Sequence, residues 1–320
     1  EPLLQENAQR FCLFPIKYPE IYNFFKLHQS TLWTSEEICL TRDKQDFATL
    51  SPDERFFIKH VLAFFAASDG IICENLLENF AREIQIPEVR AYYSCQGYIE
   101  NVHSETYSIL IDNLVLDKDE KLRLFNAVSH YPCIARKAEF CTTYMDPCRP
   151  FAQRLLAFSI VEGLFFSASF CAIFWLKTKG KMPGLSVSNQ FISRDEALHF
   201  RFAAHLYKHH VVNKLSEKSV HAMFLDSYAI ERDFVCASLP VALLGINSDT
   251  MVLYVESVID TLLFHLGYRK LFNTACPFDW MTGICLDGKT NFFEQRVSEY
   301  ASASSCINAN DVLEFDDDDF

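Results

Sequence analysis

The sequence predicts an all-α protein, a bundle of long helices followed by an acidic tail. Three observations support this: apolar residues recur at helical spacing, Gly is scarce (9 of 320 residues), and strand-like alternation is absent. Half of the residues are hydrophobic, which is ample for a large core. Because the helical segments are joined by short loops, we expect one helical domain over residues 1–286 and a flexible tail over 287–320.

The first long helix is predicted over residues 51–84. Ser51 is a favourable N-cap, Pro52 suits the first helical position, and acidic residues fill the first turn. Further helices are predicted over 86–115, 118–130, 132–145, 150–180, 184–211, 216–244 and 247–270.

Charge and cysteine content exclude several classes of protein. Lys and Arg number 29 against 42 Asp and Glu, so the formal net charge is −13 and no basic patch favours nucleic acid. The 12 cysteines form no CxxC pair, and we expect reduced thiols that lie mostly in the core. No signal peptide opens the chain, so we expect a cytoplasmic protein. Because the chain begins at Glu1 rather than Met, we also expect further residues before it.

The segment Arg154–Lys177 has a single ionisable residue between its ends, Glu162. Its length fits a membrane span. However, the flanking helices are amphipathic and no basic cluster adjoins it, so we expect a buried helix of the bundle instead. A buried carboxylate without a partner costs several kcal/mol or loses its charge, so Glu162 must meet a cation or a proton.

Two of the predicted helices carry the pattern Glu-x-x-His, as Glu100–His103 and Glu196–His199. Helical residues three apart share a face. One such pattern is an unremarkable chance match, but two on two long apolar stripes indicate a shared site. Tyr107 lies four residues after His103 and joins its face.

Two further carboxylates complete the set. Asp69 lies on the apolar stripe of its helix, where a solvated acid would not, and Glu162 is the isolated acid described above. Four carboxylates and two histidines from four long helices are the ligand set of a dinuclear site in a helical bundle. This oxygen-rich set suits iron or manganese better than zinc. Taken alone, each histidine could instead be a hydrogen-bonded core residue rather than a metal ligand.

A redox-active metal pair that meets O₂ would oxidise the nearest susceptible side chain, the phenol of Tyr107. Phe166 and Phe170 follow Glu162 at +4 and +8, hence on its face. With Ile192 they would form a dry, unreactive wall. The alternative interpretation is that these three side chains are ordinary core residues with no role at the site.

Three other histidines, His205, His209 and His210, lie near a basic helix end in the segment HLYKHH. They include an i, i+4 pair, but this pair lacks an acidic third ligand. We therefore expect these histidines to be solvated.

On these residues the chain resembles the small, radical-generating subunit of class I ribonucleotide reductase, of the eukaryotic and large-DNA-virus type. The resemblance covers nearly the whole chain and includes ENVHSETYSILID, VEGLFFSASFCAIFWLK, ISRDEALH and GKTNFFEQRVSEY. It implies a ferritin-like bundle with an oxo-bridged diiron centre, two iron ions per chain, rather than manganese. Such a centre activates O₂ and forms a stable tyrosyl radical, which the large subunit uses to make deoxyribonucleotides.

The resemblance also implies roles for single residues. Tyr107 matches the radical site, and Tyr300 matches a tail tyrosine that relays the radical to the partner. Trp33 and Asp195 match a hydrogen-bonded chain that passes through a ligand histidine. The implied ligands are Asp69, Glu100 and His103 for one iron and Glu162, Glu196 and His199 for the other. The implied radical pocket consists of Phe166, Phe170 and Ile192.

The acidic end VLEFDDDDF resembles the tail that docks into the large subunit, with Phe315 and Phe320 as apolar anchors. The alternative is a merely solubilising tail. The resemblance implies a homodimer or heterodimer of small subunits, and no nucleic-acid or membrane partner.

Two other functions remain open. A non-catalytic paralogue would scaffold an active small subunit, but it would not need all six ligands. Another ferritin-like oxidase or an iron-storage protein would have no use for Trp33, Tyr107 and Tyr300.

The chain departs from the family's common pattern at Gly97, Phe140, Ala168, Gln190 and Ala197. Gly inside a helix costs roughly 0.5–1 kcal/mol. We therefore expect a local distortion at Gly97, just before Glu100.

Overall fold

The structure is a computed structural model that describes residues 1–239 and 245–281. This part of the chain contains no β-strand, which confirms the all-α class. The predicted boundary between 286 and 287, the acidic tail and Tyr300 lie outside the described residues and stay predictions. The helices are α1 (Pro19–Ser30), α2 (Thr41–Thr49), α3 (Pro52–Asn75), α4 (Ala81–Glu83), α5 (Pro87–Leu114), α6 (Lys118–Phe125), α7 (Ala127–His130), α8 (Pro132–Met145), α9 (Phe151–Ile160), α10 (Ser167–Thr178), α11 (Pro183–His209), α12 (Glu217–Ser238) and α13 (Ser248–Leu266).

Most predicted helices are confirmed, and their ends have local causes. Ser51 and Glu54 form a reciprocal capping box at the start of α3. The predicted helix 118–130 is in fact two, α6 and α7, which meet at Asn126. The predicted end at residue 270 is wrong, because Gly267 adopts φ 87° and ends α13 after Leu266. Helices α1 and α2 were not predicted.

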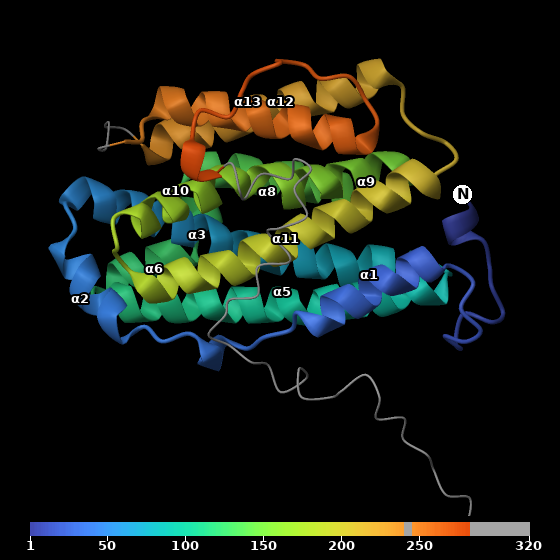
Figure 1. The fold of residues 1–320 in the computed structure, drawn as a ribbon, viewed down its shortest axis with the longest axis horizontal. Coiled ribbons are helices and arrows are strands. Elements are labelled where there is room, and N and C mark those ends of the chain that lie inside the picture. The colour runs from blue at the N-terminus through green and yellow to red at the C-terminus, as the bar shows by residue number, and fades with distance from the viewer. Residues whose placement is uncertain (240–244, 282–320) are drawn as a thin grey trace, which may run out of the picture. The chain divides into compact units, whose positions relative to one another are not determined.

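Long helices pack side by side in this part of the chain (Figure 1). Helix α5 packs against α3 and α1, and α11 packs against α9 and α10. Helix α12 packs against α13 and α8. The core therefore lies between α3, α5, α11 and the segment of α9 and α10, which are the helices that carry the predicted ligands.

Among the described residues, two helical segments are long and apolar enough to cross a membrane, Pro52–Glu83 and Phe151–Thr178. The most apolar window of the second is 94% buried by the other helices, and that of the first is 61% buried. Burial in the bundle therefore accounts for the hydrophobicity of the segment around Glu162, as predicted, and for more than half of the apolar window of the other segment.

Both of these segments contain a π turn that the sequence analysis did not predict. The turns are η3 (Leu76–Phe80) and η4 (Val161–Phe165), and η4 carries Glu162. Such turns are rare and occur often at functional sites. The distortion expected at Gly97 is absent, since α5 runs unbroken from Pro87 to Leu114.

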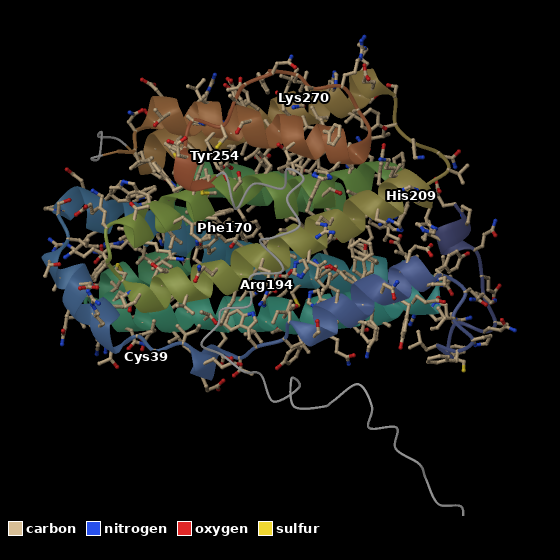
Figure 2. All side chains as sticks on the ribbon, viewed as in Figure 1. Cys39, Phe170, Arg194, His209, Tyr254 and Lys270 are labelled. Atoms are coloured by element: carbon tan, nitrogen blue, oxygen red, sulfur yellow. The ribbon has the colours of Figure 1, made fainter. Side chains whose placement is uncertain are left out.

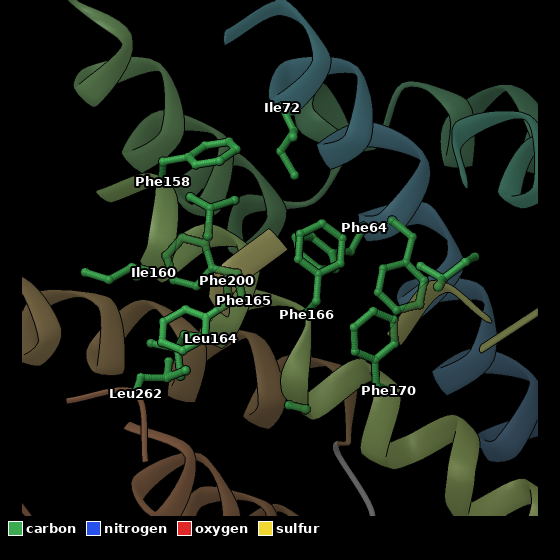
Figure 3. Close-up of a cluster of buried hydrophobic side chains, with 14 of the residues drawn as sticks. Phe64, Ile72, Phe158, Ile160, Leu164, Phe165, Phe166, Phe170, Phe200 and Leu262 are labelled. Carbon is green, nitrogen blue, oxygen red and sulfur yellow. The ribbon is translucent and has the colours of Figure 1, made fainter. Parts of the chain in front are cut away.

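Gly163 allows η4 to approach its neighbours closely. A Cβ atom at this position would lie 2.8 Å from Leu262 Cδ2 and 2.9 Å from Phe200 Cδ2. Leu262 and Phe200 belong to α13 and α11, and both side chains lie beside the turn in Figure 3. A side chain at position 163 would therefore push η4, which carries Glu162, away from α11 and α13.

The expectation that the cysteines lie mostly in the core is wrong for the described residues. Of the ten cysteines there, only Cys171 is buried, and four are exposed. One of the exposed cysteines, Cys39, lies at the edge of the helices in Figure 2, whereas most core positions hold larger apolar side chains.

A buried ion pair contacts the π turn η4. Lys137 Nζ on α8 lies 2.6 Å from Glu231 Oε2 on α12, and both side chains are almost fully buried. The same Nζ donates a hydrogen bond of 2.8 Å to the carbonyl oxygen of Phe165, the last residue of η4. It also lies 3.8 Å from the ring centroid of Phe64. Lys137 thus ties η4 to two neighbouring helices.

We expect Lys137→Met to lower the free energy of unfolding by about 3–5 kcal/mol, because it leaves Glu231 buried without a counter-charge. Urea denaturation followed by circular dichroism measures this. Adding Glu231→Leu to that variant should restore part of the loss, though not the hydrogen bond to Phe165. A single variant as stable as the parent would contradict this role.

Candidate metal centre

Six side chains converge in the core of the bundle. Glu100, Glu162, Glu196 and His199 each offer a ligand atom, and these atoms all lie within 4.8 Å of one another. All six predicted ligands are at most 2% exposed. They are Asp69 from α3, Glu100 and His103 from α5, Glu162 from η4, and Glu196 and His199 from α11.

His103 and Asp69 join this group from its edge. His103 Nδ1 lies 3.3 Å from Glu100 Oε2 and 3.2 Å from Glu196 Oε1. Asp69 is fully buried, and after burial itself the charge of Glu100 is the main cause that raises the pKa of Asp69. The structure therefore brings all six predicted side chains together.

The donor atoms of this cluster are unusually short of partners. Every one of the six residues has at least one buried oxygen or nitrogen without a hydrogen-bond partner. Both oxygens of Asp69 and of Glu196 are in this state, as are the Nδ1 atoms of both histidines. Buried polar atoms are normally hydrogen-bonded. Carboxylate-rich sets of this kind hold iron or manganese, so the residues fit a pair of divalent cations.

Without metal, protons balance the charge of the cluster. Burial and the nearby Glu196 and Glu100 raise the pKa of Glu162, and burial likewise raises the pKa of Asp69. Burial would lower the pKa of His103, but contacts with Asp195, Glu100 and Glu196 raise it well above its usual value. Cations that enter the cluster must therefore displace protons.

Trp33, Asp195 and His103 form a continuous hydrogen-bonded arrangement. Trp33 Nε1 donates to Asp195 Oδ2 at 2.8 Å, and His103 Nε2 lies 3.3 Å from the same oxygen. Arg194 binds the other oxygen, Oδ1, at 2.9 Å. Burial would raise the pKa of Asp195, but the charges of Arg194 and His103 lower it, so the carboxylate stays ionised and fixes the ring of His103.

His28 on α1 makes the equivalent contact to the other histidine, and the sequence analysis missed it. Its Nε2 lies 2.8 Å from His199 Nε2, and its Nδ1 lies 3.2 Å from Cys95 Sγ. Burial, with the charge of His199, lowers the pKa of His28 to about 3, so this imidazole is neutral. With Nδ1 of His199 facing the carboxylates, its Nε2 carries the proton. This Nε2–H donates a hydrogen bond to Nε2 of His28. No spacing signal links α1 to this site.

Gln96 is a second residue that was missed. Its Nε2 donates to Glu162 Oε1 at 3.1 Å and to Glu100 Oε1 at 3.3 Å. Gln96 lies four residues before Glu100 on α5, so helical spacing alone could have identified it. It bridges two carboxylates that would otherwise repel each other.

One aromatic ring packs directly on Tyr107, and two more pack on that ring. The ring of Tyr107 stacks on Phe65 with centroids 4.4 Å apart. Phe65 in turn lies 5.6 Å from Phe166 and 5.3 Å from Phe170. The predicted wall therefore meets Tyr107 through Phe65, which was not assigned to it, and Ile192 is fully buried on α11.

The hydroxyl of Tyr107 is buried and has no hydrogen-bond partner. Burial is the main cause, and the charge of Asp69 the second, that raises the pKa of Tyr107 well above its usual value. The phenol is therefore neutral, dry and adjacent to the carboxylates.

Comparison with known proteins relates this arrangement to one family. The family model "Ribonucleotide reductase, small chain" matches residues 10–277. A ribonucleoside-diphosphate reductase small chain of Nicotiana tabacum is 53% identical over 312 residues, which cover 97% of this chain and 94% of the relative. The same protein of Trypanosoma brucei brucei is 54% identical over 303 residues, which cover 95% and 90%.

Solved structures show the same fold. The ribonucleotide reductase Rnr4 homodimer of Saccharomyces cerevisiae has a TM-score of 0.81 at 34% identity, over 93% of this chain and 92% of that one. The dimanganese(II)-NrdF of Streptococcus sanguinis has a TM-score of 0.71 at 16% identity, over 84% and 94%, and shares the fold alone.

We expect the affinity of the cluster for Fe²⁺ to fall as the pH is lowered, because metal ligands must be deprotonated. Because the pKa values of Asp69 and Glu162 are raised, these carboxyls take up protons at a higher pH than ordinary carboxyls do. These protons compete with the metal. Anaerobic titration against a competing chelator measures this affinity, and a weakly buffered solution reports proton release. Binding that is independent of pH and releases no protons would contradict the expectation.

Proposed function

The chain belongs to the ribonucleotide reductase small-chain family and is the small subunit of a ribonucleoside-diphosphate reductase, and on this premise we propose that its core cluster holds two iron ions that generate a radical on Tyr107. One observation carries the proposal: buried donor atoms without partners on all six residues lie beside a buried, neutral phenol. Asp69, Glu100 and His103 would hold one ion, and Glu162, Glu196 and His199 the other.

When bound, the iron pair supplies, with O₂ as the oxidant, the chemistry that removes one electron and one proton from Tyr107. The raised pKa of Tyr107 keeps its proton on the oxygen until oxidation, so electron and proton leave together. Phe65, Phe166 and Phe170 exclude water and offer no easily oxidised group, so a radical formed here is protected.

We propose that Trp33, Asp195 and His103 carry the oxidising equivalent between the core and the surface. Asp195 accepts hydrogen bonds from both rings, which holds them in fixed orientation. Tyr300 would continue this route toward the large subunit, and the acidic tail would dock there. The solved yeast relative is a homodimer, and we propose that this chain also forms a dimer.

The alternative, a subunit that only scaffolds an active partner, is disfavoured by the complete ligand set. A scaffold needs neither six buried ligands nor a dry phenol beside them. About two iron ions per chain after loading supports the active form, and far less than one supports the scaffold. The same metal analysis distinguishes iron from manganese.

We expect protein loaded with Fe²⁺ and exposed to O₂ to give the electron paramagnetic resonance signal of a tyrosyl radical. Tyr107→Phe should abolish this signal and leave the iron content unchanged, because only the oxidisable oxygen is lost. Tyr93→Phe is the matched control, since Tyr93 lies on the same helix and is also buried with an unpartnered hydroxyl.

Two outcomes would contradict the radical assignment. One is a signal that persists in Tyr107→Phe. The other is a parent protein that holds two iron ions per chain and gives no signal.

Removing residues 312–320 should abolish binding to the large subunit and leave iron loading unchanged, because the tail lies outside the bundle sequence that carries the ligands. Sedimentation of the mixed subunits measures binding. Phe315→Ala with Phe320→Ala in the full chain tests whether the aromatic anchors, rather than the acidic charge, carry the interaction. Binding that survives the truncation would refute the docking role.

A further inference from the structure

A second group of metal-ligating side chains lies at the C-terminal end of α11, away from the core cluster. Glu20 in the first turn of α1, His205 in α11 and His210 at its C-cap each offer a ligand atom within 4.8 Å of the others. Figure 2 marks this end of α11 by the label of His209. The expectation that these histidines lack an acidic third ligand is therefore wrong, because α1 supplies Glu20.

The rings of the two histidines are packed against aromatic neighbours, and their Nε2 atoms make no hydrogen bond. The Nε2 atoms of both His205 and His210 are buried and have no hydrogen-bond partner. The ring of His205 lies 5.3 Å from that of Phe24, and the ring of His210 packs edge-on against Tyr18 at 5.4 Å. Two nitrogen ligand atoms are thus fixed on half-buried residues, and neither makes the hydrogen bond that a buried polar atom normally makes.

Both imidazoles are in the form that binds metal. Burial, with the charges of His209 and His210, lowers the pKa of His205 to about 4. Burial likewise lowers the pKa of His210, although Glu20 partly opposes this. Neutral rings near pH 7 offer lone pairs without first losing a proton.

The distances suit a small tetrahedral ion. Ligand bonds of about 2.0–2.1 Å in tetrahedral geometry place ligand atoms about 3.3 Å apart. His210 Nε2 and Glu20 Oε1 are already 3.5 Å apart. The side chain of Glu20 is 45% exposed, so it can adjust, and it leaves one side of the group open to solvent.

We propose that Glu20, His205 and His210 form a second metal site, which binds Zn²⁺ with solvent as the fourth ligand. Two imidazoles and one carboxylate are a known protein ligand set for zinc, whereas the carboxylate-rich core favours iron. The bound ion joins the start of α1 to the end of α11. The same two helices carry His28 and His199, which are in contact. The bound ion would therefore stabilise that contact by linking the helices.

The test is a zinc titration of the full chain, with the core first loaded with iron, against a chromophoric chelator. The parent should bind one more zinc ion per chain than His210→Ala, whatever zinc the core takes up. Glu20→Gln should weaken the binding of this zinc ion by roughly tenfold or more, since even changes to groups that only support the ligands commonly cost this much. His209→Ala is the matched control, because His209 is an exposed neighbour outside the ligand group, and it should bind like the parent.

Thermal unfolding gives an independent readout. Zinc should raise the Tm of the parent and of His209→Ala, raise that of Glu20→Gln less, and leave that of His210→Ala unchanged, because a ligand stabilises the native state in proportion to how tightly it binds. Equal unfolding temperatures of all four proteins without zinc show that the substitutions leave the fold intact. Equal zinc stoichiometry in the parent and His210→Ala, or equal loss in His209→Ala, would overturn the site. Neither result depends on whether Tyr107 forms a radical.

Discussion

Four carboxylates that face one another inside a hydrocarbon core are the constraint on which this structure depends. Like charges so close cannot all remain ionised without compensation. The molecule meets this need in two ways, by protons in the metal-free state and by cations in the proposed loaded state. Each way requires that the four helical segments hold their side chains in fixed positions. The apolar packing around the cluster, the Gln96 bridge and the buried Lys137 all serve that requirement.

The two histidines of the cluster have different surroundings. His103 faces an ionised carboxylate, Asp195, which is itself paired with Arg194. His199 faces a neutral imidazole, His28, which is backed by a thiol. Outer partners set the basicity of a ligand histidine, so the two halves of the cluster are electronically unlike. Trp33 stacks on His103, and Asp69 is the charge that acts most strongly on Tyr107, so the proposed radical route runs along the half of the cluster that contains Asp69 and His103.

Much of the fold and the membership of the cluster could be predicted from sequence. The Glu-x-x-His patterns and the isolated acids Asp69 and Glu162 carry a strong signal, because burial of unpaired charge is so unfavourable. Their role as metal ligands stays a proposal. Helical periodicity assumes one repeat throughout, so it could not predict the π turns. It also gives no distance between helices, so it could not pair His28 with His199 or Glu20 with His205.

The π turn at Val161–Phe165 also bears on how this sequence can change in evolution. A π turn holds one residue more than a regular helical turn, so the helix accommodates an insertion there without losing its course. Deleting that residue would restore a regular α-helix, but it would rotate everything that follows by about 100°. Phe166 and Phe170 would then turn away from Phe65. Insertions and deletions are usually tolerated in surface loops. Here a change of one residue in length would alter which side chains face the core, so the length of this helix matters to the core as much as the identity of its residues does.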